Sequence, residues 1–270
     1  MNLTFIGGGN MATALLGGLI GRGHTPAALT VIEPDPDRRD ALVRRFGVRA
    51  QTEADSISTC DILLLAVKPQ ILRTVLRALP PLPAHACVLS VAAGVRARDI
   101  QRWLGGHAAI VRAMPNTPAL IGAGISGAYA LEAVSAAQRA SVTQVLEAVG
   151  EVVWVDDETA IDGVTAVSGS GPAYVFYFIE ALEAAARELG LGADTARRLS
   201  LATVEGAAAL ARHEAIEPAE LRARVTSKGG TTERGIAALD AHGFQTAVLA
   251  AARAAAARAA ELGDALGAEP

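Results

Sequence analysis

The segment from Leu3 to Ala12 constrains the fold of this chain more than any other. The apolar run Leu3–Ile6 predicts a buried strand, and Gly-Gly-Gly-Asn-Met-Ala follows it directly. This G-x-G-x-x-A spacing allows a tight turn, a close approach of the backbone and close packing of a helix on a sheet. The helix that begins there presents free amides and its positive dipole end, which favour a phosphate group. We therefore predict that a dinucleotide is bound by Gly7, Gly8, Gly9, Asn10 and Met11.

Short apolar runs alternate with helical patterns through the first half of the chain. They predict further strands at residues 29–32, 62–67, 87–91, 109–111 and 151–155, with helices at 36–46, 70–79 and 136–149. Such alternation predicts a parallel sheet with helices on both faces. Because the runs at 62–67 and 87–91 are almost continuously apolar, we expect both faces of these two strands to be covered. The prediction is a Rossmann-type, doubly wound α/β domain over residues 1–156.

Beyond Asp156 the pattern indicates helices alone. They are predicted at residues 174–189, 195–212, 218–225, 232–241 and 244–266. The run Tyr174–Ile179 is apolar around the whole helix, which is typical of a buried helix. A helical domain of this size is small for burying such a helix, and helices of a second subunit would supply the cover. We predict an all-α dimerisation and substrate-binding domain over residues 157–270, and a homodimer formed through it.

Glu33 follows the second predicted strand, at the position where open α/β sheets read the adenosine ribose. A carboxylate there hydrogen-bonds a ribose 2′-hydroxyl and repels a 2′-phosphate. Arg38 and Arg39 are suited to that phosphate, or else to a solvated helix face. Glu33 is therefore predicted to bind the cofactor, and the choice between NAD and NADP stays open.

Three further loops follow predicted strand ends, where open α/β sheets bind ligands. Pro69 holds Lys68 extended, and two prolines flank Asn116 and Thr117 close to where a nicotinamide is expected. The residues at 92–94 are small enough for a ribose to lie against the backbone. The predicted cofactor contacts in these loops are Ala66, Val67, Lys68, Pro69, Ala92, Ala93, Gly94 and Asn116.

The run Val225–Glu233 carries the chemistry predicted for the second half. It places two glycines and two threonines at the start of a helix. Free amides at a helix N-terminus, with hydroxyls beside them, favour an anion such as a carboxylate. We therefore predict a small-molecule substrate, bound by Thr117, Ser227, Gly229, Gly230, Thr231 and Thr232.

Charge and composition argue against several classes of partner. The net charge of −4 leaves no basic surplus for the phosphates of nucleic acid. The uncharged stretch 1–21 has no basic region ahead of its apolar part, which argues against a signal peptide. Glycines and Asn10 interrupt it early, which argues against a membrane span. Cys60 and Cys87 lie in apolar runs, and no Cys/His cluster has the spacing of metal ligands. We predict a cytoplasmic protein with no metal, nucleic acid or membrane as partner.

These motifs, taken in order, resemble those of the pyrroline-5-carboxylate reductase family. The most specific match is Leu221–Gly235, and Gly7–Ala12, Ala66–Pro69, Met114–Pro118 and Ser168–Tyr174 also look like family motifs. The resemblance implies reduction of the cyclic imine 1-pyrroline-5-carboxylate to L-proline by NAD(P)H, the last step of proline biosynthesis. It also implies that Thr232 is the catalytic residue, hydrogen-bonded to the ring nitrogen, and that dimers in some members build a ring.

Two residues depart from the family pattern, and three other functions compete. Lys228 stands where proline is common, and Glu33 stands where many members have Ser, Asn or Arg, which favour NADPH. A reductase of the related imine 1-pyrroline-2-carboxylate is one alternative. A β-hydroxyacid dehydrogenase is another, although its catalytic lysine would be expected near Val175. A non-catalytic dinucleotide-binding protein is the third.

Overall fold

The computed structural model describes residues 1–54, 57, 59–214 and 216–268. The chain forms two compact units. The first contains Met1–Ser170 and the chain from Arg253 onward, and the second contains Gly171–Ala252. These units divide the chain at other positions than the predicted domains. The reason is that the short helix at Ala160–Val164 contacts the sheet of the first unit. The C-terminal segment from Arg253 also belongs to the first unit.

One mostly parallel sheet forms the centre of the first unit. In the described residues it has eight strands in the order β3-β2-β1-β4-β5-β6-β7-β8. Their bounds are β1 Leu3–Ile6, β2 Leu29–Ile32, β3 Arg49–Gln51, β4 Ile62–Leu65, β5 Cys87–Ser90, β6 Ile110–Met114, β7 Gly124–Ala130 and β8 Gly150–Trp154. The order reverses between β1 and β4, and ligands bind at the carboxyl ends of the strands at such a switch point. The predicted doubly wound fold is confirmed.

The sequence does not predict two of these strands. β7 has the sequence Gly-Ile-Ser-Gly-Ala-Tyr-Ala and runs antiparallel to β6. Glycine and alanine have low strand propensity, so pairing with β6 and β8 on its two sides makes this segment a strand. β3 has three residues and lies at the edge of the sheet. Both strands therefore depend on non-local partners.

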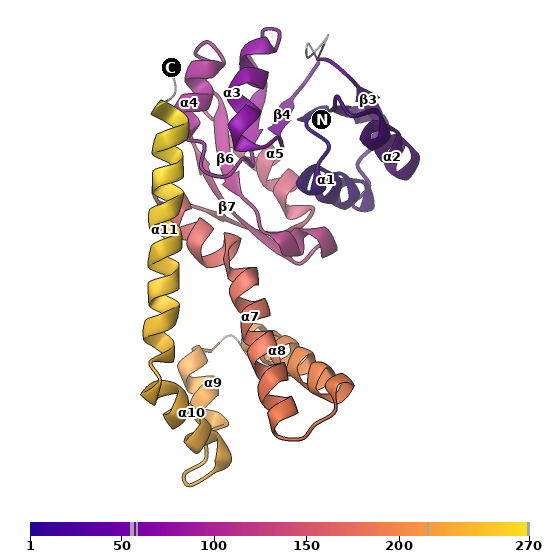
Figure 1. Ribbon diagram of the computed structural model, residues 1–270. Helices are drawn as coiled ribbons and strands as arrows, with labels where there is room; N and C mark the ends of the chain where they lie inside the picture. The colour runs from indigo at the N-terminus through magenta and orange to yellow at the C-terminus, as the bar shows by residue number, and fades with distance from the viewer. Residues whose placement is uncertain (55–56, 58, 215, 269–270) are drawn as a thin grey trace. The chain divides into compact units, whose positions relative to one another are not determined.

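Helices cover both faces of the sheet (Figure 1). They are α1 Asn10–Gly21, α2 Pro36–Phe46, α3 Pro69–Ala78, α4 Ala97–Trp103, α5 Ala136–Glu147 and α6 Ala160–Val164, with short turns η1 Pro26–Ala28, η2 Thr117–Ile121 and the π-helical η3 Thr165–Gly169. On one face, Leu16 of α1, Val145 of α5 and Leu64 of β4 belong to one buried cluster. On the other face, Leu63 of β4 and Leu72 of α3 belong to a second buried cluster. The strands β4 and β5 are buried at every residue, as predicted, whereas β3 and β8 at the two edges of the sheet are partly exposed.

The second unit contains helices alone in its described residues. They are α7 Gly171–Glu188, α8 Ala193–Glu214, α9 Pro218–Arg224, α10 Thr231–Ala241 and the first part of α11 Phe244–Ala268. All five begin and end close to the predicted bounds, and α7 packs beside α8 (Figure 1). None of the helices in the described residues is long and apolar enough to span a membrane.

The apolar segment of α7 is exposed in the single chain. Phe176 is 58% exposed and Tyr177 is 75% exposed. This exposure agrees with the expectation that a small helical unit has too little interior to enclose the helix, and its cover by a second subunit stays a prediction. A hollow of about 510 Å³ lies on this face, lined by apolar residues that include Tyr174, Tyr177, Phe178, Phe244 and Val248. An apolar surface of this kind is typical of a protein–protein interface.

Candidate active site

The glycine loop between β1 and α1 has the geometry of a phosphate-binding turn. Gly7 has a φ of +95°, and a Cβ there would lie 2.9 Å from the carbonyl oxygen of Ala66, so this position requires glycine. A Cβ on Gly9 would meet no atom within 4 Å, so open space lies in front of the loop. Ala12 is fully buried against the sheet. The space before Gly9 and the first amides of α1 fit a pyrophosphate group.

The Glu33 carboxylate lies against this loop. It is 4% exposed and accepts hydrogen bonds from the Gly8 amide at 2.9 Å and the Asp35 amide at 3.1 Å. Arg38 donates to the same carboxylate at 3.2 Å, while Arg39 donates to the carbonyl oxygens of Glu33 and Pro34. Both arginines therefore face the end of β2. A fixed negative charge, partly balanced by Arg38, lies where a ribose is expected.

Two more predicted loops lie beside the glycine loop at the carboxyl edge of the sheet. The Ala66 amide donates to the Ile6 carbonyl at 2.9 Å, and a Cβ on Gly7 would lie 2.8 Å from Val67. Lys68 is exposed and extended before Pro69, which begins α3. After β5, Ala92 and Gly94 are buried and Ala93 is exposed. The structure thus brings residues 7–11, 66–69 and 92–94 to the ends of three neighbouring strands.

The loop after β6 combines a buried and an exposed polar residue. Asn116 is 9% exposed, and its Oδ1 accepts a hydrogen bond from the Ile125 amide at 2.9 Å. That bond ties the loop to β7, so Asn116 has a structural role whatever it binds. Thr117 is exposed at the start of η2. Both residues lie in the first unit, at the same carboxyl edge as the cofactor loops.

The predicted substrate residues of the second unit lie at the start of α10. Gly229 has a φ of +74°, and its amide donates to the Glu233 carboxylate at 2.8 Å. The Gly230 amide donates to the Ser227 carbonyl at 3.0 Å, which closes a turn ahead of the helix. Thr231 and Thr232 occupy the first turn of α10 and are exposed, as are Ser227 and Lys228. The arrangement leaves hydroxyls exposed beside the first turn of a helix, which favours an anion, and the substrate role of these residues stays a prediction.

Four charged side chains that the sequence does not predict as functional lie together in the first unit. We name Arg96, Arg112, Glu158 and Asp162 the Arg112 cluster. Arg112 is 2% exposed, and its guanidinium lies 3.2 Å from Glu158 and 3.6 Å from Asp162. Burial lowers the pKa of Arg112, and the two carboxylates oppose that shift. The sequence signal was a single arginine inside the apolar run Ile110–Met114.

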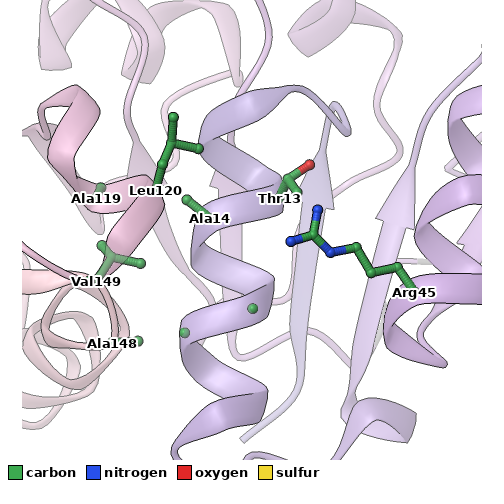
Figure 2. A pocket seen from close by; sticks show the side chains of 10 residues that line it. Thr13, Ala14, Arg45, Ala119, Leu120, Ala148 and Val149 are labelled. Carbon is green, nitrogen blue, oxygen red and sulfur yellow. The ribbon is translucent and has the colours of Figure 1, made fainter. Parts of the chain in front are cut away.

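Other groups in the first unit do not form a site. A cavity of about 140 Å³ lies beside α1 and is lined by none of the predicted residues. Figure 2 shows the side chains that line it. Thr13 and Arg45 carry the polar side chains of its lining, which is otherwise small or apolar. Cys60 and Cys87 are buried, as expected. In the described residues, no group of three or more His, Cys, Asp or Glu side chains is placed to hold a metal ion.

Fold and geometry together define a class of protein. A glycine loop at the β1–β4 switch point, followed in sequence by a helical unit with an anion-binding helix start, is typical of a dinucleotide-dependent oxidoreductase. A family profile described as pyrroline-5-carboxylate reductase dimerisation matches residues 158–262. A second profile, described as NADP oxidoreductase coenzyme F420-dependent, matches residues 2–94.

Similar proteins narrow that class. A pyrroline-5-carboxylate reductase of Pseudomonas aeruginosa is 45% identical over 267 residues, 98% of each chain. A solved structure of a pyrroline-5-carboxylate reductase from Coxiella burnetii is 40% identical, with a TM-score of 0.91 over 97% of this chain and 98% of that one. A pyrroline carboxylate reductase from Plasmodium falciparum, solved with NADP bound, is 27% identical with a TM-score of 0.86 and the same coverage.

The chain belongs to the pyrroline-5-carboxylate reductase family. It is an oxidoreductase of the kind that acts on CH–NH bonds. The family and the fold class expected from the sequence are both confirmed.

Proposed function

We propose that this protein reduces 1-pyrroline-5-carboxylate to L-proline with NAD(P)H, the last step of proline biosynthesis. The observation that carries the proposal is the start of α10. Gly230, Thr231 and Thr232 form an exposed helix N-terminus there, ahead of which Gly229 turns the chain. Relatives that match almost the whole chain bear the name of this reductase, which supports the same substrate.

The first unit would hold the dinucleotide. The amides at the start of α1 and the open space before Gly9 would receive the pyrophosphate. Residues 66–69, 92–94 and 116 would line the path toward the nicotinamide, while Glu33 would face the adenosine ribose. When bound, the reduced nicotinamide supplies the hydride.

The second unit would hold the substrate. Ser227, Gly230 and Thr231 would bind its carboxylate through amides and hydroxyls, and Gly229 would shape the turn. Thr232 would hydrogen-bond the ring nitrogen and hold the proton there. A protonated imine is already an electrophile, so its reduction needs mainly orientation. The exposed Thr117 of the first unit is proposed as a further substrate contact.

We propose that both coenzymes are used, and that Glu33 reduces any advantage of NADPH. Its buried carboxylate disfavours a 2′-phosphate. Arg38 balances part of that charge, and the Plasmodium relative was solved with NADP bound.

We further propose a cytoplasmic homodimer formed through the C-terminal helices. The dimerisation profile over residues 158–262 and the exposed apolar face of α7 support the dimer. A ring of such dimers is the larger assembly that the family resemblance implies. Light scattering of the purified protein distinguishes a dimer from a ring by mass.

One assay tests the proposed reaction. The purified protein is mixed with NADH or NADPH and with either 1-pyrroline-5-carboxylate or 1-pyrroline-2-carboxylate. In a separate reaction it is mixed with the oxidised coenzyme and a β-hydroxyacid. The expected result is coenzyme oxidation that is fastest with 1-pyrroline-5-carboxylate and yields proline. A faster reaction with 1-pyrroline-2-carboxylate would reassign the substrate, and coenzyme binding without any turnover would indicate a non-catalytic protein.

A further inference from the structure

The Arg112 cluster is charged, has Arg112 and Asp162 buried at its centre, and is unused by the mechanism proposed above. We propose that it is a positioning device, which fixes the segments that hold the nicotinamide half of the dinucleotide. The proposal rests on the proposed function, because those segments are the predicted cofactor loops at residues 92–94 and 116. The adenosine half has its own predicted residues on β1 and β2, which are separated from β6 by β4 and β5 in the sheet.

Each member of the Arg112 cluster ties down a different segment. Arg112 lies on β6, which ends at Met114, shortly before Asn116. Arg96 is the N-cap residue of α4, two positions after Gly94, and its guanidinium lies 3.1 Å from Asp162 of α6. Glu158 accepts both from Arg112 at 3.2 Å and from the Ala97 amide at 2.7 Å. The start of α4 and the end of β6 are therefore fixed to the same carboxylates.

Close packing around the cluster leaves these segments little freedom. A Cβ on Gly169 would lie 2.6 Å from Met114, so η3 presses on the end of β6. A Cβ on Gly263 of α11 would lie 3.0 Å from the Gly94 carbonyl and 2.8 Å from Arg96. A shift of Arg96 or Arg112 would thus be passed directly to the chain at 94 and 114.

Directionality distinguishes this cluster from ordinary core packing. Replacing a buried ion pair by apolar residues of similar volume is often neutral for stability, so stability alone does not explain the buried Arg112 and Asp162 with two partly buried partners. Hydrogen bonds between charged groups have strict distances and angles, and therefore fix the backbone that carries them. Asp162 Oδ1 has no hydrogen-bond partner and pairs with Arg112 only at 3.6 Å, so the carboxylate is held mainly by its other oxygen and Arg96.

The test compares the whole coenzyme with its adenosine half. Binding of NADPH and of 2′,5′-ADP is measured by calorimetry for the wild type and Arg112→Met, with NADH and 5′-AMP used instead if the wild type prefers NADH. We expect Arg112→Met to weaken binding of the whole coenzyme about tenfold and to lower kcat about 10- to 100-fold. Binding of the adenosine half should stay within about twofold of the wild type, because distant sites act independently.

A matched control and a milder variant keep the test decisive. The control is Arg102→Met on α4. The Arg102 guanidinium pairs with Asp99 at 2.9 Å but its side chain is 57% exposed, so this substitution should leave the affinity for both ligands unchanged. Arg96→Met removes a less buried member and should reproduce the selective loss if Arg112→Met fails to fold. Equal weakening of both ligands, or no change in either, would overturn the positioning role. A wild type that neither binds the coenzyme nor reduces the imine would instead overturn the proposed function.

Discussion

The two compact units differ in how they bury apolar surface. In the first unit, β1, β4 and β5 are buried at every residue. In the second, Ala196 is the one fully buried hydrophobic residue among those the structure describes. The apolar residues of α7 are instead exposed, and Phe178 contacts Phe244 at a ring-centroid distance of 6.2 Å. One unit therefore has its own core, whereas the other leaves most of its apolar residues exposed on the single chain.

This difference also separates the proposed chemistry. The residues proposed for the cofactor lie on the unit that has its own core, at the ends of buried strands. Residues 227–232, proposed for the substrate, lie on the unit without one. Coenzyme binding should therefore survive loss of assembly better than turnover does.

The largest expected effect comes from a charge on the exposed face of α7. Phe178→Asp should weaken association by about 3–5 kcal/mol, because an unpaired carboxylate would be buried in the interface. The mass should fall to that of a monomer and turnover should be lost, as measured by light scattering and the reductase assay. Val43→Asp, on the exposed side of α2 at a similar exposure, is the control and should leave the mass unchanged. An intact, active dimer of Phe178→Asp would contradict the comparison.

A core substitution in the first unit should act without changing assembly. Leu64 is fully buried, and Leu64→Ala should lower the free energy of unfolding by about 3 kcal/mol, through lost burial and a residual cavity. Urea unfolding followed at two protein concentrations measures this. The decrease in the free energy of unfolding should be the same at both concentrations. A decrease that becomes smaller at the higher concentration would show that Leu64 affects association of the subunits.

Thr232→Ala should separate turnover from coenzyme binding. Loss of a hydrogen bond to a charged ring nitrogen costs about 1.5–3 kcal/mol, so kcat should fall about 10- to 100-fold. Coenzyme affinity should stay unchanged, because Thr232 lies in the second unit. Steady-state kinetics and coenzyme titration give both values, with Thr232→Ser as a variant that keeps the hydroxyl. Unchanged turnover in Thr232→Ala would remove this residue from the mechanism.

Glu33→Gln should shift coenzyme preference toward NADPH. Removing the negative charge while keeping the side-chain shape should raise the ratio of kcat/KM for NADPH over NADH about tenfold, since repulsion of a 2′-phosphate is lost. Asp37→Asn, close by on the exposed first turn of α2, is the control. A large NADPH preference already present in the wild type would contradict the ribose-reading role of Glu33.

The smallest expected effect is a loss of stability at alkaline pH, caused by the buried Cys87 in the core of the first unit. Burial raises the pKa of the Cys87 thiol to about 12 from its ordinary 9.0. A thiol whose pKa is raised on folding gives full stability below pH 9, and stability is lost as the pH rises from 9 toward 12. At pH 10 the loss should be about 1 kcal/mol, measured as the difference in urea unfolding between the wild type and Cys87→Ala. A difference that does not depend on pH would show that Cys87 is not buried in solution.

The predictions from sequence succeeded where local pattern and structure coincide. The run Leu3–Ala12 became β1, the glycine turn and the start of α1, because each step depends on residues a few positions apart. The helix predicted from residue 136 also begins there as α5, because the adjacent Ser135 and Gln138 cap it with reciprocal hydrogen bonds. The segment Gly124–Ala130 was not predicted, because its strand pairs exist only with β6 and β8.

By itself, the sequence determined the class of fold, the phosphate-binding turn, the helices of the second half and the family, because periodicity, glycine placement and motif order are local properties. Tertiary structure decided the rest. It turned Glu33 onto the glycine loop, gathered Arg112 with Glu158 and Asp162, and left α7 exposed on a single chain. Each of these depends on which distant segments pack together, and a long-range contact is fixed by the folded chain as a whole.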